Sequence, residues 1–142
     1  MRDMLTHLDI RPAIVPVAAA SADNTPLVST ILNRLGFESV VLAIVTGNLA
    51  DADATFAVTL DHGDMANLSD ASAVPADQLN GSLVNAGFTF THDSAARKIG
   101  YVGNKQYVRA TITPSNNAGA APIVATWILA TPNMMPTAGV PG

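Results

Sequence analysis

Three histidines, His7, His62 and His92, are the side chains whose type could support a metal site or acid–base catalysis. His62 and His92 each lie beside an acid, and His with carboxylates at short spacing is a common metal-binding and catalytic combination. Residues 61–64 (Asp-His-Gly-Asp), however, have the composition of a turn, since Asp and Gly favour turn positions. We therefore predict a solvent-exposed turn at His62 rather than a metal or catalytic site.

Other patterns of chemistry-bearing residues are incomplete. Asp51 and Asp53 have the spacing that begins a calcium-binding loop, but the glycine and the closing glutamate of that loop are missing. The sequence holds no HExxH, GxSxG, GxxxxGK[ST] or GxGxxG motif and no Cys. We predict no enzymatic activity, no cofactor and no metal, with a weak surface calcium site as the alternative that Asp51 and Asp53 leave open.

The basic residues are concentrated in one segment. Four of the seven lie between Arg97 and Arg109, interleaved with two tyrosines, whereas the chain as a whole carries a net charge of −4. Three interpretations fit this segment: half-buried tyrosines on strands with charged neighbours, a protein interface, or a nucleic-acid contact. The acidic chain disfavours a general nucleic-acid binder. The candidate partner-contact residues are Arg97, Lys98, Tyr101, Asn104, Lys105, Tyr107 and Arg109.

Short runs of β-branched residues, separated by turn residues, indicate how these side chains are positioned. A tight hairpin turn is expected at Gly103-Asn104, and one helical turn within residues 75–80. The pattern predicts an all-β domain of the β-sandwich or jelly-roll type, with a closed barrel as the alternative. The expected strands cover residues 13–18, 26–32, 38–46, 55–61, 87–91, 98–102, 106–114 and 122–131.

With 142 residues the chain suits one domain. We expect an N-terminal arm at residues 1–12, the β-sandwich domain at 13–131 and a Pro/Gly-rich C-terminal arm at 132–142. No apolar run approaches the roughly 20 residues of a membrane helix, and Asp9 and Arg11 interrupt any export signal. These features predict a protein made in the cytoplasm of its producing cell, with no membrane partner.

Residues 97–113 (RKIGYVGNKQYVRATIT), with Gly36-Phe37-Glu38-Ser39 and Leu68-Ser69-Asp70 earlier in the chain, resemble the head decoration, or cement, proteins of tailed bacteriophages. The resemblance covers about residues 8 to 130. It implies a jelly-roll β-sandwich that binds the major capsid protein on the exterior of an icosahedral head. It also implies a homodimer or homotrimer at local symmetry axes and no direct nucleic-acid contact. The C-terminal PNMMPTAGVPG departs from the short basic end expected of that family.

A carbohydrate- or host-surface-binding β-sandwich module on the virion is the alternative function. Such a module needs exposed aromatic side chains, whereas the one Trp and two Tyr of this chain fall within expected strands. A small β-sandwich hydrolase is a further class, but it needs a nucleophile and a base that this sequence does not bring together. The sequence therefore favours a structural virion protein.

Overall fold

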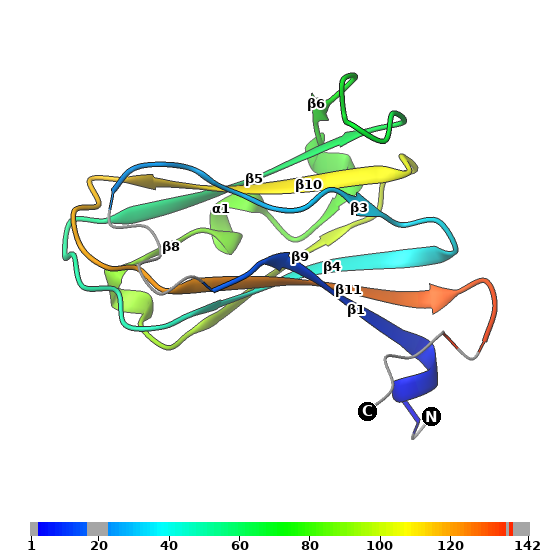
Figure 1. Cartoon of the computed structure of the whole chain (residues 1–142), viewed down its shortest axis with the longest axis horizontal. Helices are drawn as coiled ribbons and strands as arrows, with labels where there is room; N and C mark the ends of the chain where they lie inside the picture. The colour runs from blue at the N-terminus through cyan, green and yellow to red at the C-terminus, as the bar shows by residue number, and fades with distance from the viewer. Residues whose placement is uncertain (1–2, 17–22, 136, 138–142) are drawn as a thin grey trace.

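A computed structural model describes residues 3–16, 23–135 and 137. Two antiparallel sheets lie one above the other, as Figure 1 shows, and the predicted all-β fold is confirmed. Sheet A has the strand order β1 (Leu8–Ile14), β11 (Ile123–Pro132), β4 (Phe37–Thr46), β9 (Ala96–Tyr101) and β7 (Leu79–Asn80). Sheet B is built on β2 (Leu27–Val28), β10 (Tyr107–Ser115), β5 (Thr55–Gly63) and β6 (Ser72–Ala73), with β3 (Leu32–Asn33) on β10 and β8 (Phe88–Thr89) on β5.

Helical structure is confined to short turns in the described residues. These are the 3-10 turns η1 (Leu5–His7), η2 (Ala76–Gln78) and η3 (Phe90–His92), and the four-residue helix α1 (Leu83–Ala86). The helical turn expected within residues 75–80 is η2, whereas α1 was not predicted. Ser82 caps α1 by accepting the Asn85 N–H at 3.1 Å. No helix in the described part of the chain has the length and apolarity needed to cross a membrane.

The long strands form because apolar residues alternate along them, which places every second side chain between the sheets. In β10, for example, Val108, Ala110 and Ile112 are buried, whereas the residues between them are partly exposed. The same alternation runs along β4, β5 and β11. Trp127, on β11, is the largest fully buried side chain of the resulting core.

From β4 onward, consecutive long strands belong to different sheets. β4 lies in sheet A, β5 in sheet B, β9 in sheet A, β10 in sheet B and β11 in sheet A. The segment with Gly103 and Asn104 therefore carries the chain from one sheet to the other, and the predicted hairpin at this position is wrong. Its five residues, 102–106, reach about 16 Å when extended, which is enough to cross the ~10 Å between packed sheets.

The first strand begins earlier than the sequence indicates. β1 pairs with β11 from Leu8 onward, so the predicted boundary between an N-terminal arm and the domain at residues 12/13 falls inside this strand. The two charges of this segment are accommodated within the strand, because Arg11 pairs with Asp9 at 2.8 Å and its guanidinium lies over the Phe37 ring. Residues 17 and 18 of the expected strand lie outside the described residues.

The predicted C-terminal arm is described only in part. Pro132 still belongs to β11, and Thr137 bonds back to the N-terminal segment, its N–H to Thr6 O at 3.0 Å and its hydroxyl to Leu8 O at 2.9 Å. Residues 136 and 138–142 lie outside the described residues. The end of β11 and the start of β1 therefore lie together at one end of sheet A.

Candidate functional site

The seven predicted contact residues do not form one surface. Lys98 points outward from sheet A, because its neighbour Ile99 is buried. Arg97 and Tyr101 share the inward parity of Ile99 on β9, and Tyr101 is 2% exposed. The prediction that Tyr101 lies on a contact surface is therefore wrong, since its strand directs it between the sheets.

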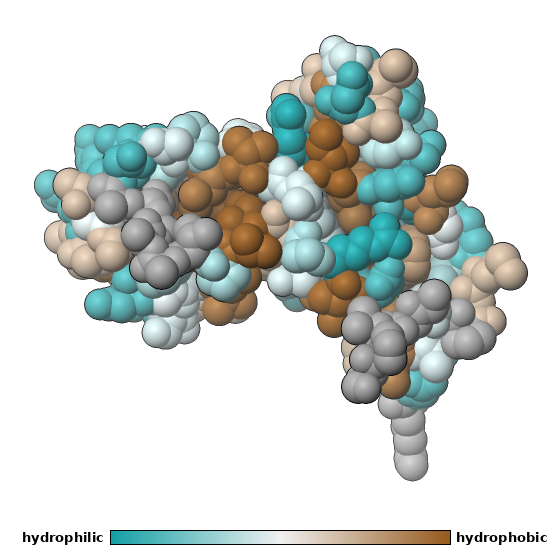
Figure 2. Space-filling model, in the orientation of Figure 1, coloured by the Kyte–Doolittle hydropathy of each residue, from teal (hydrophilic) through white to brown (hydrophobic). Residues whose placement is uncertain are grey.

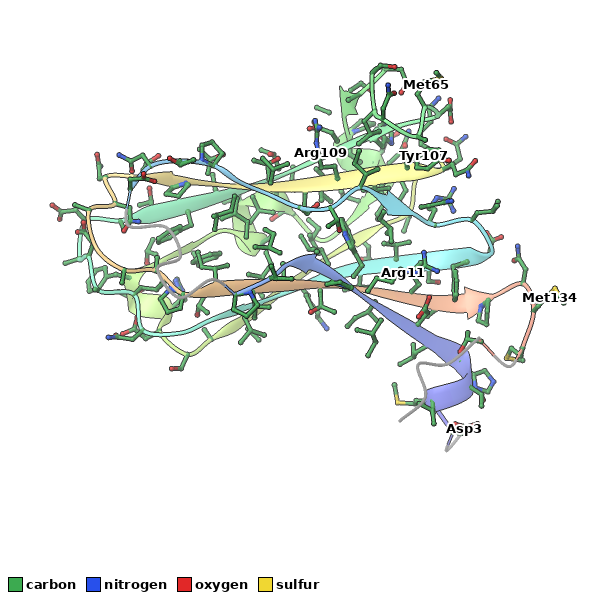
Figure 3. The ribbon with its side chains drawn as sticks, in the orientation of Figure 1. Asp3, Arg11, Met65, Tyr107, Arg109 and Met134 are labelled. Carbon is green, nitrogen blue, oxygen red and sulfur yellow. The ribbon has the colours of Figure 1, made fainter. Side chains whose placement is uncertain are left out.

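The other contact candidates lie on the connection to sheet B and on β10. Asn104 is exposed, Lys105 is partly buried, and Tyr107 and Arg109 are half-buried on the outer side of β10. Figure 3 shows Tyr107 and Arg109 together on β10, beneath the loop that carries Met65.

Acidic neighbours neutralise two of the four basic residues of this segment, and the other two, Arg97 and Lys98, lie on opposite sides of β9. Arg109 pairs with Asp61 directly across the β5–β10 ladder at 3.1 Å, and Lys105 pairs with Asp64. The Lys105–Asp64 contact raises the pKa of the lysine. The cluster of basic residues in the sequence is thus not a basic patch in space, which removes the charge argument for a nucleic-acid contact.

Tyr101 instead joins a buried polar cluster with His62. The Tyr101 hydroxyl lies 2.8 Å from His62 Nδ1 and accepts the Lys105 backbone N–H at 3.1 Å. His62 lies inside β5 and is 5% exposed, so the predicted exposed turn at residues 61–64 is also wrong. Burial lowers the pKa of His62 and raises the pKa of Tyr101.

Arg34 holds the inter-sheet connection against this cluster. Its Nε donates to Lys105 O at 2.5 Å, its Nη1 donates to Phe37 O at 3.3 Å, and its guanidinium lies 5.8 Å from the Tyr101 ring centroid. Gly103 is needed in this connection because a Cβ there would overlap the Tyr101 hydroxyl and the Gln78 amide oxygen. These contacts give the segment an architectural role.

The carboxylates at Asp51 and Asp53 form a turn. Asp51 accepts the backbone N–H groups of Asp53 at 3.0 Å and Ala118 at 2.7 Å, which lowers its pKa. Across residues 3–16, 23–135 and 137, no three His or acidic side chains gather as metal ligands would. Asp51 thus ties the β4–β5 connection to the segment that precedes β11.

The outer side of sheet A is the surface that the sequence analysis missed. Alternation and register direct a largely apolar set of side chains to this side, and Lys98 is the charged member among the outward residues of β1, β11, β4 and β9. Ile10 and Val45 are 57% and 49% exposed. We call this set the apolar face; it comprises Leu8, Ile10, Val41, Ala43, Val45, Ala96, Val124, Ile128 and Ala130.

The outer side of sheet B has a different composition. Thr59 opposes Thr111 and Ala57 opposes Thr113 along the β5–β10 ladder, and the Asp61–Arg109 pair continues the row. Threonine, alanine and paired charges are ordinary for a solvated sheet. The sequence already indicates that the outer side of sheet A is more apolar than that of sheet B. Along β4 and β11 both the inward and the outward residues are largely apolar, whereas along β5 and β10 the apolar residues alternate with Thr.

A groove extends the apolar face at the end where β1 begins. It encloses about 410 Å³ and is lined by Met4, His7 and Leu8 on one side and by Ala130 and Met135 on the other. Figure 2 shows further apolar surface along the side of the sandwich, between the two layers. Thr30 donates its N–H to Ala13 O at 3.0 Å, so the segments that carry the exposed residues Val15 and Ile31 lie side by side.

No protein-family model and no curated protein matches this sequence.

Proposed function

We propose that this chain is a non-catalytic virion protein that decorates and stabilises the exterior of a tailed-bacteriophage head by bridging subunits of the major capsid protein. The proposal rests in part on the resemblance of residues 36–39, 68–70 and 97–113 to head decoration proteins. It includes the jelly-roll assignment of the sandwich, terminal arms limited to the residues before β1 and after β11, and a homodimer or homotrimer on the shell.

The apolar face is the observation that carries this proposal. Four strands at about 4.8 Å spacing and about seven residues at 3.3 Å give a flat area of roughly 450 Å², which is largely apolar and also holds the outward side chains of Thr126 and Lys98. Contiguous apolar patches of this size on soluble proteins commonly mark interaction sites. The capsid protein covers this face in our proposal, with Lys98 at its margin, and the terminal groove extends the contact.

The alternative as a sugar-binding module has less support. Such a site uses exposed aromatic rings. Trp127 and Tyr101 are both buried, and Tyr107 is half-buried beside the Arg109–Asp61 pair. The apolar face consists of aliphatic side chains, which suit a protein surface better than a glycan.

The test uses heads that lack the protein, to which purified chain is added. We expect the added chain to raise the temperature at which the heads release DNA. Ile10→Asp and Val45→Asp place a charge on the apolar face and should each weaken attachment at least tenfold, because an unpaired charge is costly in an apolar interface. Thr59→Asp, an exposed change on the outer side of sheet B, is the matched control.

Two results would contradict the proposal. Heads with and without the chain would release DNA at the same temperature, or Thr59→Asp would weaken attachment as much as the changes on the apolar face. Both readouts require that the variants keep the unfolding temperature of the wild-type chain, which the exposure of these positions predicts.

A further inference from the structure

A second surface of interest is a cleft of about 500 Å³ between the two sheets, beside α1. It exists because β8 pairs with β5 only at Thr55 and Phe56, and β6 pairs with β5 only at Asp61 and His62. The middle of this edge of β5 has no strand partner within the described residues, and α1 packs there between β5 and β9. Figure 1 shows α1 between the two layers.

The cleft has apolar walls. The rings of Phe56 and Phe88 stack with their centroids 4.9 Å apart, and Leu83 and Val84 of α1 lie beside them. Val84 is 87% exposed, although it is a large aliphatic side chain on a short helix. The phenylalanine rings are only 2% and 3% exposed, so an apolar group that enters the cleft would cover Val84 and Leu83, which lie in front of them.

One cation faces this apolar surface. Arg97 lines the cleft from β9 and has the inward parity of Ile99. Its Nε is buried without a hydrogen-bond partner, and the ion pairs of the described chain are those of Arg11, Lys105 and Arg109. A buried guanidinium N–H without an acceptor is costly, so an incoming carboxylate gains a charge-assisted hydrogen bond here.

His92 adds a second donor to the same cleft. Its Nδ1 accepts the Thr89 backbone N–H at 3.1 Å, which leaves the proton of the neutral ring on Nε2. None of the residues that line the cleft is acidic. The cleft therefore combines apolar lining residues with two hydrogen-bond donors, Arg97 and His92, and has no acidic side chain. This combination is complementary to an apolar group that carries a carboxylate.

We propose that this cleft binds a segment of a partner protein in which an apolar side chain lies next to a Glu or Asp. The apolar side chain packs on Leu83 and Val84, and the carboxylate accepts hydrogen bonds from Arg97. The site is separate from the apolar face, so the inference does not depend on the capsid role. A protein segment suits the cleft because neighbouring residues of a chain can present an apolar side chain and a carboxylate together, which matches Leu83 and Val84 beside Arg97.

The test measures binding of a blocked tripeptide, acetyl-Phe-Glu-Leu-amide, to the full chain by nuclear magnetic resonance. We expect saturable shifts at the Phe88 amide and at the Arg97 Nε–H. The same peptide with Gln in place of Glu should bind about tenfold more weakly, the usual effect of losing one charge-assisted hydrogen bond. Octanoate, which has the same charge on a flexible chain, should bind more weakly than the Glu peptide.

Variants of two adjacent residues complete the design. Arg97→Gln should weaken binding of the Glu peptide about tenfold and leave the Gln peptide unchanged, and Arg97→Lys should keep part of the preference. Lys98→Gln removes the next charge along β9, on the outer side of sheet A, and should change nothing. The Arg97 Nε–H shift reports the contact in the wild-type chain, even if a variant unfolds.

Four outcomes would overturn the inference. These are an absence of saturable binding at millimolar peptide, equal binding of the Glu and Gln peptides, equal loss in Lys98→Gln and Arg97→Gln, or tighter binding of octanoate. The last result would assign the cleft to a small amphipathic carboxylate rather than to a protein segment. We expect Arg97→Gln to attach to heads as the wild type does, which would show that the cleft and the apolar face act independently.

Discussion

His62 couples the stability of the fold to pH. Burial, with the positive charge of Lys105 as a second cause, lowers the pKa of His62 below the free value of 6.5. The unfolded chain therefore takes up this proton at a higher pH than the folded chain. The free energy of unfolding has its full value above about pH 6.5 and falls as the pH drops through 6.5 toward the lower pKa of the folded state.

We expect His62→Gln to remove this dependence. Chemical unfolding at about pH 7.5 and about pH 5.5 measures it, since the two values bracket the ordinary histidine pKa. The wild type should lose more stability between them than His62→Gln does, and His7→Gln, at a partly exposed position, should behave as the wild type. Equal losses in the wild type and His62→Gln would contradict the prediction.

Gly103 gives a prediction on packing. Gly103→Ala places a methyl group against the Tyr101 hydroxyl and the Gln78 amide, so it should lower the free energy of unfolding by about 1–3 kcal/mol. Asn104→Ala, at the exposed neighbouring position, should change it by less than about 0.5 kcal/mol. Denaturant unfolding of the two variants measures both changes. A similar loss of unfolding free energy in Gly103→Ala and Asn104→Ala would show that the close approach at Gly103 does not restrict the side chain there.

At the level of single residues, the local composition around His62 did not predict its position, because strand pairing elsewhere in the fold determines it. Residues 61–64 have turn composition, yet β5 extends through Gly63 because β10 pairs with it along its whole length. His62 is then directed inward, where Tyr101 supplies a hydrogen-bond partner from the other sheet. A partner 39 positions away leaves no local signal, so the sequence could not reveal this contact.

Among the elements, β1 is the one whose role differs most from the expectation. It covers the free edge of β11, and Arg11 lies opposite Trp127 in the ladder. We expect a chain that lacks residues 1–7 to keep the fold, because the described part of this segment, residues 3–7, adds η1 and a hydrogen bond from Thr137 to Thr6 O but no strand of either sheet. A chain that lacks residues 1–14 should leave one edge of β11 without a partner strand, while β4 still pairs with the other edge, and should expose the indole of Trp127.

Tryptophan fluorescence distinguishes these two truncations, because Trp127 is the one Trp of the chain and is 1% exposed. The shorter truncation should keep the emission maximum of the full chain. The longer one should shift it to longer wavelength and lower the unfolding temperature. An unchanged spectrum in the longer truncation would mean that β1 adds nothing to the core.

The elements that the sequence predicted well are those with long apolar alternation. The bounds expected for the strands at 38–46, 106–114 and 122–131 agree with β4, β10 and β11 to within one residue at each end. Residues 27–33 form two short strands instead, because the Ser29 hydroxyl replaces a backbone carbonyl as the acceptor of the Ala110 N–H, and Thr30 turns to donate its N–H to Ala13 O of β1. The turn at Gly103-Asn104 shows that turn composition indicates a change of direction but not which sheet the next strand joins.

For the whole molecule, the two outer sheet surfaces should behave differently in water. Ile10→Lys with Val45→Lys adds two charges to the apolar face, and we expect it to raise the solubility limit and to reduce binding of an apolar fluorescent dye. The matched pair Ala57→Lys with Thr59→Lys, on the outer side of sheet B, should have a smaller effect on dye binding. Equal effects of both pairs would show that the apolar face is not the dominant exposed apolar surface.

The alternation of successive long strands between the sheets also has a consequence for how the chain folds. None of these strands can pair with the next one along the chain, so a hairpin of two neighbouring long strands is not available as a first stable intermediate. The β4–β11 ladder, for instance, closes a loop that contains β5, β9 and β10. Because such loops lose entropy before any ladder forms, we expect refolding in the millisecond-to-second range typical of β-sandwiches rather than in microseconds.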